Sequence, residues 1–287
     1  MSASAEEDDY VDPDPDTKIG RVRTALMKLY REHRDSGMLP TSNRFLFYEL
    51  IGLKVIAKGG IQRPDLVVHR ALTDLREQGL IPWEHIVDET RTVMDFTGSE
   101  TVADDWLHYL HSARRDPWEG NPPFILTESR SLAGVLRRLC TDYRCRIAST
   151  NGQVGGFLRT KVAPLLEPES CIAYLGDFDL CGGDIEDNTQ KVLESEVGEL
   201  DWRRLALTEE QVSRYSLPRI TKKDRRFKNG GGTHEAVETE ALSQSLIVEI
   251  VRDWLDSLLP APLEEIHASE EEQREELRQL VERFMER

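Results

Sequence analysis

The sequence contains no long hydrophobic run, and none of its segments approaches the roughly 20 consecutive apolar residues that a membrane helix requires. Its acidic first residues lack the basic stretch followed by an apolar stretch that marks a secretory signal. Cysteine is scarce, and the four cysteines form no C-x-x-C pair and have no histidine at zinc-like spacing. We therefore expect a cytoplasmic protein without a membrane segment, whose cysteines are buried thiols in a reducing compartment.

The chain also lacks an excess of basic residues, because it has 37 Lys and Arg against 53 Asp and Glu, for a net charge of −16. Such a charge argues at first against a nucleic-acid partner, since phosphate contacts are made by Lys and Arg. The charge is unevenly distributed, however. Residues 1–16 hold seven acids and no base, whereas residues 17–95 hold 13 basic and 10 acidic residues. A DNA contact is therefore expected on residues 17–95.

A length of 287 residues predicts about two domains. Residues 1–16 are expected to form a disordered acidic tail. In the first domain, residues 17–95, apolar residues recur at helical spacing from Thr17 and again over 43–53 and 65–78. Two apolar stretches, 80–82 and 86–94, then have the character of short strands. Three helices followed by a small β-element predict a winged helix-turn-helix domain that binds DNA.

The second domain, residues 124–287, follows a linker over 96–123 that is rich in proline and glycine towards its end. Short apolar strands alternate with helices, which is typical of an α/β fold with a parallel sheet covered by helices. The strands are predicted at 124–127, 146–150 and 171–175, and the helices at 131–143, from the glycines near 155 to 166, and at 185–197. Two helical extensions, 235–259 and 269–287, complete the chain.

Carboxylates follow two of these strands, where ligands bind in open α/β sheets. Glu128 comes directly after the first strand, and Asp177 and Asp179 come after the third. Side chains at positions i and i+2 of an extended segment point to the same side, so Asp177 and Asp179 are expected to face one ion that Glu128 approaches from the neighbouring strand. Three carboxylates favour Mg²⁺ over a metal with soft ligands.

The order of these residues resembles the Toprim domain of topoisomerases, primases and several nucleases. That family has a Glu after the first strand, a Gly after the second and a D-x-D after the third, which correspond here to Glu128, Gly152 and Asp177 with Asp179. The resemblance covers about residues 124–194. It implies Mg²⁺-dependent chemistry on phosphodiesters, with Glu128, Asp177 and Asp179 holding one or two Mg²⁺ ions.

A tyrosine in the first domain narrows the resemblance. The segment Thr41-Ser-Asn-Arg44-Phe-Leu-Phe47-Tyr48 is similar to the T-x-R-x-x-Y-Y motif in the A subunit of type IIB topoisomerases and its meiotic relative. Arg44 and Tyr48 lie in the register of that motif, four residues apart on one helical face. Phe47 replaces the first tyrosine, and one extra residue separates the threonine from the arginine.

This second resemblance implies that Tyr48 and Arg44 are catalytic residues. Tyr48 would attack double-stranded DNA and stay linked to a 5′ end, and Arg44 would assist the attack. It also implies a homodimer in which the tyrosine of one protomer meets the Toprim cluster of the other. Nothing in the chain is similar to the ATPase half of a type IIB topoisomerase, so strand passage would need a separate ATPase subunit. Two alternatives stay open: a hydrolytic Toprim nuclease of plasmid or phage defence in which Tyr48 is structural, and a DNA-binding adaptor with a vestigial metal site.

Two further features have both a functional and a structural interpretation. Glu238 and Glu240 lie in Val237-Glu-Thr-Glu-Ala-Leu242, which is similar to a glutamate-containing helix late in A-type subunits. They would either support the metal cluster or be solvated helix acids. The segment 219–228 has six Lys and Arg against one Asp, and is either a loop that contacts phosphates or a solvated loop.

Overall fold

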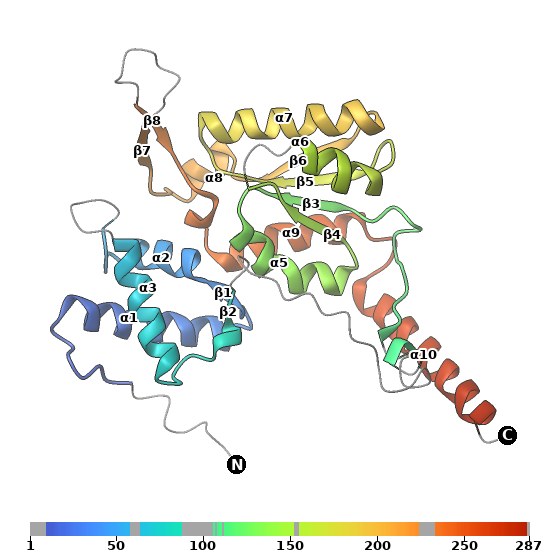
Figure 1. Cartoon of the computed structure of the whole chain (residues 1–287), viewed down its shortest axis with the longest axis horizontal. Coiled ribbons are helices and arrows are strands. Elements are labelled where there is room, and N and C mark those ends of the chain that lie inside the picture. Colours follow the sequence, from blue (N-terminus) through green and yellow to red (C-terminus); the bar gives the residue numbers. More distant parts are fainter. Residues whose placement is uncertain are drawn as a thin grey trace.

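The N-terminal domain consists of three helices, as the apolar spacing predicts. They are α1 (Lys18–Asp35), α2 (Asn43–Gly52) and α3 (Pro64–Glu77). The computed structural model describes residues 10–57, 64–87, 106, 108–110, 112–151, 155–223 and 233–285 (Figure 1). The helices enclose a core of their own, to which Leu26, Leu46 and Leu75 contribute fully buried side chains.

The small β-element of this domain differs from the predicted wing. Strand β1 (Thr41–Ser42) pairs in parallel with β2 (Ile86–Val87), and the predicted strand at 80–82 is wrong. There the amides of Leu80 and Ile81 donate to the carbonyl of Leu75 and close the end of α3, and the 3₁₀ turn η1 (Trp83–His85) follows. The rest of the predicted strand 86–94 lies outside the described residues. The structure therefore does not confirm a winged helix.

The acidic N-terminal segment is packed against α1 from Tyr10 onward, which corrects the expectation of a disordered tail for residues 10–16. The Asp12 side chain is buried and accepts hydrogen bonds from the Arg23 guanidinium at 2.6 and 3.1 Å. The hydrogen bonds from Arg23 hold the pKa of Asp12 well below its usual value, although burial opposes them. This ion pair explains why residues 10–16 pack against α1, because a buried ion pair needs both partners fixed.

The second domain contains a four-stranded parallel sheet, which confirms the α/β class. Its strands are β3 (Phe124–Thr127), β4 (Arg146–Ser149), β5 (Cys171–Leu175) and β6 (Asp201–Ala206), in the order β4-β3-β5-β6. The first three match the predicted strands within one residue. Strand β6 is absent from the prediction, because Asp-Trp-Arg-Arg at a partly exposed edge does not produce an apolar run.

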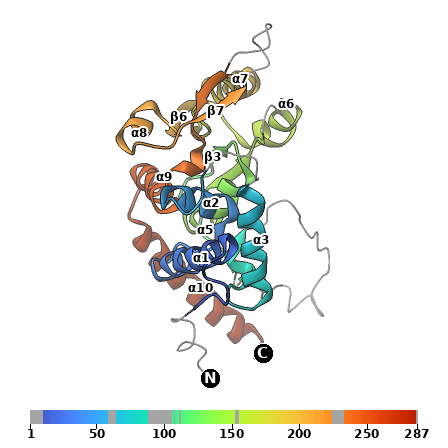
Figure 2. The same cartoon turned by 90° about the vertical axis from the view of Figure 1, so that its left-hand side faces the viewer.

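Helices cover both faces of this sheet (Figures 1 and 2). On one face lie α5 (Arg130–Tyr143) and α9 (Gln244–Leu258), which bury Leu136, Val251 and Leu255 against the strands. On the other face lie α7 (Leu180–Val197) and a short helical segment made of α6 (Gly155–Phe157), η2 (Leu158–Val162) and η3 (Ala163–Leu165). Because helices cover both faces, the central strands β3 and β5 are buried along almost their whole length.

The predicted helix 235–259 is wrong at its start. After α8 (Glu209–Arg214), the hairpin of β7 (Ile220–Lys223) and β8 (Thr233–Ala236) projects from the domain, and the 3₁₀ turn η4 (Thr239–Ala241) follows. Helix α9 begins only after Ser243, whose hydroxyl accepts from the amide of Leu246 and caps it. Glu238 and Glu240 therefore lie outside a helix of the predicted kind.

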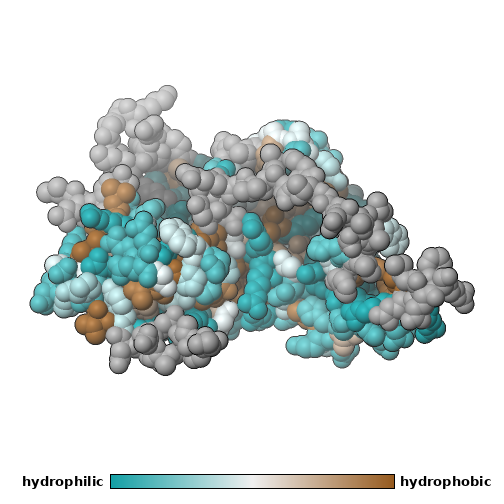
Figure 3. All heavy atoms as spheres, turned by 60° about the horizontal axis from the view of Figure 1, so that its bottom comes forward, coloured by the Kyte–Doolittle hydropathy of each residue, from teal (hydrophilic) through white to brown (hydrophobic). Residues whose placement is uncertain are grey.

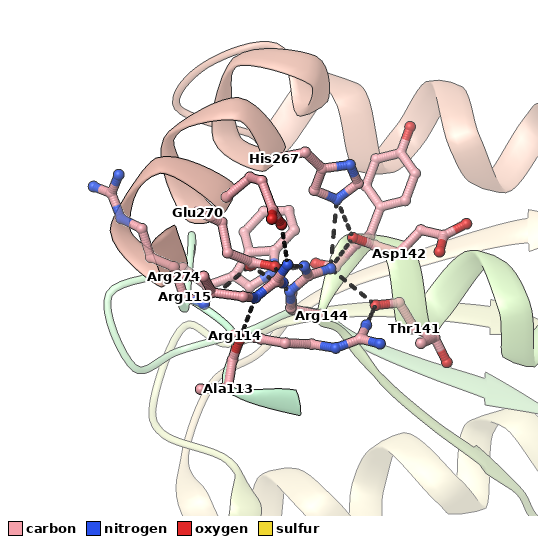
Figure 4. Close-up of polar contacts among 12 residues, drawn as sticks. Ala113, Arg114, Arg115, Thr141, Asp142, Arg144, His267, Glu270 and Arg274 are labelled. Atoms are coloured by element: carbon pink, nitrogen blue, oxygen red, sulfur yellow. Dashed lines mark hydrogen bonds and ion pairs between the residues drawn. The ribbon is translucent and has the colours of Figure 1, made fainter. Parts of the chain in front are cut away.

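The last helix, α10 (Leu263–Met285), begins six residues before the predicted 269 and is fastened by the buried Glu270. Its carboxylate accepts hydrogen bonds from the Arg144 guanidinium at 2.7 Å and from the amide of Arg115 at 3.0 Å, and it pairs with Arg274 (Figure 4). Burial alone would raise the pKa of Glu270, but the hydrogen bonds from Arg144 and Arg115 hold it below its usual value.

Helix α2 joins the two domains. Leu46 and Leu50 belong to the core of the N-terminal domain, whereas Phe45, also fully buried, belongs to the core of the sheet domain. Gln244 adds a polar contact, because its side-chain amide donates to the carbonyls of Met38 and Pro40 at 2.6 and 3.0 Å.

On the face shown in Figure 3, brown hydrophobic residues are scattered among hydrophilic ones. No helix within the described ranges is long and apolar enough to cross a membrane.

Candidate functional site

Glu128 and Asp177 meet at the carboxyl ends of the central strands β3 and β5. These strands are paired in register, with Thr127 opposite Leu175. The Glu128 carboxylate accepts a hydrogen bond from the amide of Asp177 at 3.0 Å, and both side chains are half-buried. The structure thus brings together two of the three predicted metal ligands.

Asp179, the third predicted ligand, is the N-cap of α7. Its Oδ1 accepts from the amide of Gly182 at 2.6 Å. A Cβ at Gly182 would lie 2.3 Å from the carbonyl oxygen of Asp177, so only glycine allows the first turn of α7 to approach the end of β5 this closely. The α7 N-terminus and the D-x-D segment are therefore built as one unit.

A segment far along the chain, Val237–Glu240, completes the site. Phe178 and Val237 exchange two backbone hydrogen bonds of 2.8 and 3.0 Å, which places this segment beside the end of β5. Asp177 Oδ1 then accepts from the amide and the hydroxyl of Thr239 at 3.0 and 3.3 Å. The two glutamates on either side of Thr239 are thereby fixed next to Asp177.

Glu240 is buried between the two domains. Its Oε1 accepts from the hydroxyls of Ser129 and Ser131 at 2.7 and 2.9 Å and lies 3.3 Å from Arg44 Nε. The other oxygen, Oε2, is also buried, and within the described part of the chain no hydrogen-bond partner reaches it. Glu240 is therefore not a solvated acid but a charged link between α2, the start of α5 and η4.

Tyr48 lies on α2, and its hydroxyl donates to Glu238 Oε2. The same oxygen accepts from Arg44 Nη2 at 2.9 Å. The two side chains are one helical turn apart, as the motif predicts, and both face Glu238. The Phe47 ring packs edge-on against the Tyr48 ring, at 5.4 Å between centroids. An open pocket beside the tyrosine is lined by Arg44, Phe47 and Asp65 among others.

The electrostatics of Tyr48 favour the neutral phenol. Burial raises the pKa of Tyr48 well above its usual value, and the hydrogen bond to Glu238 raises it further. Burial alone would lower the pKa of the Arg44 guanidinium, but the charges of Glu240 and Glu238 raise it overall. Arg44 thus stays charged, and its charge opposes the rise in the pKa of Tyr48.

Arg204 supports the strand end, a role that the sequence does not reveal. Its guanidinium donates to the carbonyls of Gly176, Asp177 and Leu207 at 3.1, 2.7 and 2.8 Å, and it pairs with Glu186. These bonds hold the backbone that carries Asp177. No sequence pattern indicates this role, because Arg204 belongs to strand β6, which has no apolar run.

The donor set fits a hard cation by its chemistry, since carboxylates at neighbouring strand ends are typical Mg²⁺ ligands. As arranged, however, Glu128, Asp177 and Asp179 each bond a backbone amide. Among the residues that the structure describes, no group of three or more His, Cys, Asp or Glu is gathered closely enough to hold an ion. A carboxylate can accept an amide hydrogen bond and still ligate a cation, so binding Mg²⁺ through all three requires the carboxylates to move closer together.

Two sequence-based predictions fall wholly or partly outside the described residues. Gly152 is one of them. In the basic segment 219–228, Arg219 pairs with Glu235 at 2.7 Å, while residues 224–228 lie outside the described ranges. The phosphate-contacting loop therefore stays a prediction.

Comparisons of the chain with protein-family models, with curated proteins and with solved structures found no match. A function for the protein must therefore be argued from the site itself. In this site, residues from α2, from the ends of strands β3 and β5 and from η4 lie close together.

Proposed function

We propose that the protein cleaves double-stranded DNA by Mg²⁺-dependent transesterification, with Tyr48 as the nucleophile. The observation that carries this proposal is the position of the Tyr48 hydroxyl, which shares Glu238 Oε2 with Arg44 and lies beside the segment that bonds Asp177. A tyrosine, an arginine and strand-end carboxylates from distant parts of the sequence thus form one site. This is the combination that the resemblance to type IIB topoisomerase A subunits implies.

In the proposed reaction, a bond forms between the Tyr48 oxygen and the scissile phosphorus, and the bond from phosphorus to the 3′ oxygen breaks. The phenolic proton passes to Glu238 as attack proceeds, and the departing 3′ oxygen takes a proton from water. The product is a 5′-phosphotyrosyl link and a free 3′ hydroxyl. Arg44 donates to the phosphate through its planar donor set, for which guanidinium is well suited.

Glu128, Asp177 and Asp179 would hold Mg²⁺ once their carboxylates move closer together. The metal supplies charge stabilisation at the phosphate and at the leaving oxygen. The chain's own contribution is to hold the strand end rigid through Arg204 and the α7 cap. The three N-terminal helices would bind the duplex, and cleavage of both strands would require a homodimer.

The state of Tyr48 favours a second candidate, a hydrolytic nuclease with the same metal site. Tyr48 is only 5% exposed, and its neutral form is favoured by burial and by Glu238. A phenol in this state suits a structural hydrogen bond as well as a nucleophile. In that case water attacks the phosphorus and no covalent protein–DNA link forms.

A plasmid cleavage assay separates these functions. Supercoiled plasmid is incubated with the protein and Mg²⁺, denatured, and analysed with and without protease. We expect DNA that stays protein-bound until protease is added, and loss of that species in Tyr48→Phe but not in the matched control Tyr109→Phe, whose side chain is exposed. Cleavage that is unchanged in Tyr48→Phe supports hydrolysis. DNA binding without cleavage, unaltered in Asp177→Ala and Asp179→Ala, supports an adaptor.

A further inference from the structure

The tyrosine lies against the sheet domain of its own chain. Tyr48 and Arg44, on α2, reach Glu238 and Glu240 of the same polypeptide, across 190 residues of sequence in the case of Tyr48 and Glu238. No second copy is needed to bring the tyrosine to the sheet domain. This differs from the arrangement implied by the resemblance, in which the tyrosine meets the carboxylates of the other protomer.

Glu238 is the link between the tyrosine and the strand-end carboxylates. On one side its Oε2 accepts from Tyr48 and Arg44. On the other side its neighbours along the chain are fixed to the end of β5, since Val237 bonds Phe178 and Thr239 bonds Asp177. The position of Tyr48 relative to Asp177 is therefore set by a short, hydrogen-bonded segment.

The helix that carries the tyrosine is also fastened to its own sheet domain. Phe45, three residues before Tyr48, is fully buried in the core beneath the sheet. Gln244 holds the segment before α2 by bonding the carbonyls of Met38 and Pro40. The buried Phe45, the two ion pairs of Arg44 and the two hydrogen bonds of Gln244 thus hold α2 and the segment before it to the sheet domain.

We propose that each chain carries a complete strand-cleaving site, in which Glu238 positions Tyr48 beside the carboxylates of its own sheet, so that cleavage occurs in cis. This inference rests on the proposed transesterase function. A homodimer would then contain two complete sites, one for each DNA strand, rather than two sites shared between protomers. Glu238 thus positions Tyr48, in addition to accepting its proton in the proposed reaction.

Heterodimers with differently tagged chains test the cis arrangement. The first pairs a Tyr48→Phe chain with an Asp177→Ala/Asp179→Ala chain, and the second pairs a wild-type chain with a chain that carries all three substitutions. Both are isolated by sequential affinity purification and incubated with plasmid and Mg²⁺. In cis, the first heterodimer is inactive, and the second nicks one strand and becomes linked to DNA through the wild-type chain. A site shared between protomers gives the reverse pattern, which would overturn the proposal.

A protein that yields no heterodimer is tested by dilution. In single-turnover reactions with saturating DNA, a cis site forms the covalent link at a rate that does not change over a hundredfold range of protein concentration. A rate that falls with dilution counts against it. If wild-type protein forms no covalent link at all under any of these conditions, the proposed function itself fails, which is a different result from either pattern above.

The positioning role of Glu238 has its own test. Glu238→Ala removes the acceptor for Tyr48, and displacement of a reacting group by about 1 Å costs on the order of 100-fold in rate. We expect that loss in covalent-link formation, partial rescue in Glu238→Gln because its amide oxygen still accepts, and no change in Glu235→Ala, an exposed glutamate on β8. Equal rates in wild type and Glu238→Ala would show that Glu238 does not position the tyrosine.

Discussion

Glu240 is 1% exposed, although a carboxylate is among the side chains that proteins bury least often. Its burial is supported by two serine hydroxyls and by Arg44, so the charge is compensated from both domains. The sequence signal for this role is weak. Ser129 and Ser131 both have the residue type of a helix N-cap, and Ser129 is the N-cap of α5. Both hydroxyls also bond Glu240, which the residue type does not indicate.

The burial of Glu240 leads to a stability prediction. Glu240→Ala removes the acceptor that the two serine hydroxyls share and one partner of Arg44, so we expect the free energy of unfolding to fall by about 2 kcal/mol. Urea denaturation followed by circular dichroism measures the change. Glu235→Ala is the control, since its ion pair with Arg219 is exposed and its loss should change stability by no more than about 0.5 kcal/mol. Equal effects of the two substitutions would contradict this role.

Two adjacent glycines at the start of α7 provide a second residue-scale prediction. Gly182→Ala places a Cβ 2.3 Å from the Asp177 carbonyl oxygen, whereas a Cβ at Gly183 meets no atom within 4 Å. We expect Gly182→Ala to destabilise the protein by about 2 kcal/mol through forced displacement of the strand end. Gly183→Ala should stabilise it by up to about 1 kcal/mol through helix propensity. Thermal unfolding of the two variants measures the difference, and a shift of the same sign in both would refute the close contact.

At the scale of elements, the buried carboxylate of Glu270 is one of the contacts that hold α10 to the sheet domain. The pKa of Glu270 is held below its usual value in the folded state, so its contribution to stability is present above about pH 4.5 and is lost as pH falls further. We expect Glu270→Gln to flatten the decrease of melting temperature below pH 4.5 and to lower stability at pH 7. Glu272→Gln, an exposed residue of the same helix, should behave as wild type. A pH profile that is identical in wild type and Glu270→Gln would contradict the assignment.

Elements with a regular apolar pattern can be predicted from the sequence. Apolar residues at helical spacing predict the three N-terminal helices, and short apolar runs predict the strands β3, β4 and β5. Helix α7 begins at Leu180 rather than at the predicted 185, because the Asp179 cap outweighs two glycines that read as a loop. Strand β6 and hairpin β7–β8 have charged sequences, and only pairing with a neighbouring strand makes them strands.

The site could be predicted only in part, for a related reason. Local spacing placed Arg44 next to Tyr48, and strand ends placed Glu128 next to Asp177. The meeting of Tyr48 with Glu238, or of Glu240 with Ser129, depends on how two domains pack, and no local pattern encodes that distance. The role of Asp179 as a helix cap was also invisible, because D-x-D at a strand end fits a metal ligand equally well.

At the scale of the molecule, Phe45 couples the two domains. It belongs to the helix of one domain and the core of the other. We expect Phe45→Ala to cost about 3 to 5 kcal/mol and to separate a single calorimetric transition into two. Phe157→Ala, at a position 36% exposed, is the control and should keep one transition. A destabilised Phe45→Ala that still unfolds in one transition would show that other contacts couple the domains.

DNA binding is the second prediction at this scale. If the N-terminal domain contacts phosphates, DNA affinity falls as salt rises, and each phosphate contact contributes close to 1 to the slope of log Kd against log salt. Arg70 is exposed on α3, the helix whose first residues border the tyrosine pocket, so Arg70→Ala should lower the slope by about 1. Lys28→Ala, exposed on α1, should leave it unchanged. A flat salt profile in wild type would place the DNA elsewhere.

The separation of 190 residues between Tyr48 and Glu238 has a consequence for biosynthesis. N-terminal domains generally fold first as the chain emerges, and the three-helix core is complete by Ile86. Until residue 240 has been synthesised, a ribosome-bound chain has a folded helical domain whose tyrosine lacks its contact with Glu238. The same holds for any fragment produced by premature termination. The site therefore becomes complete only after the segment Val237–Glu240 has been synthesised and has packed against α2.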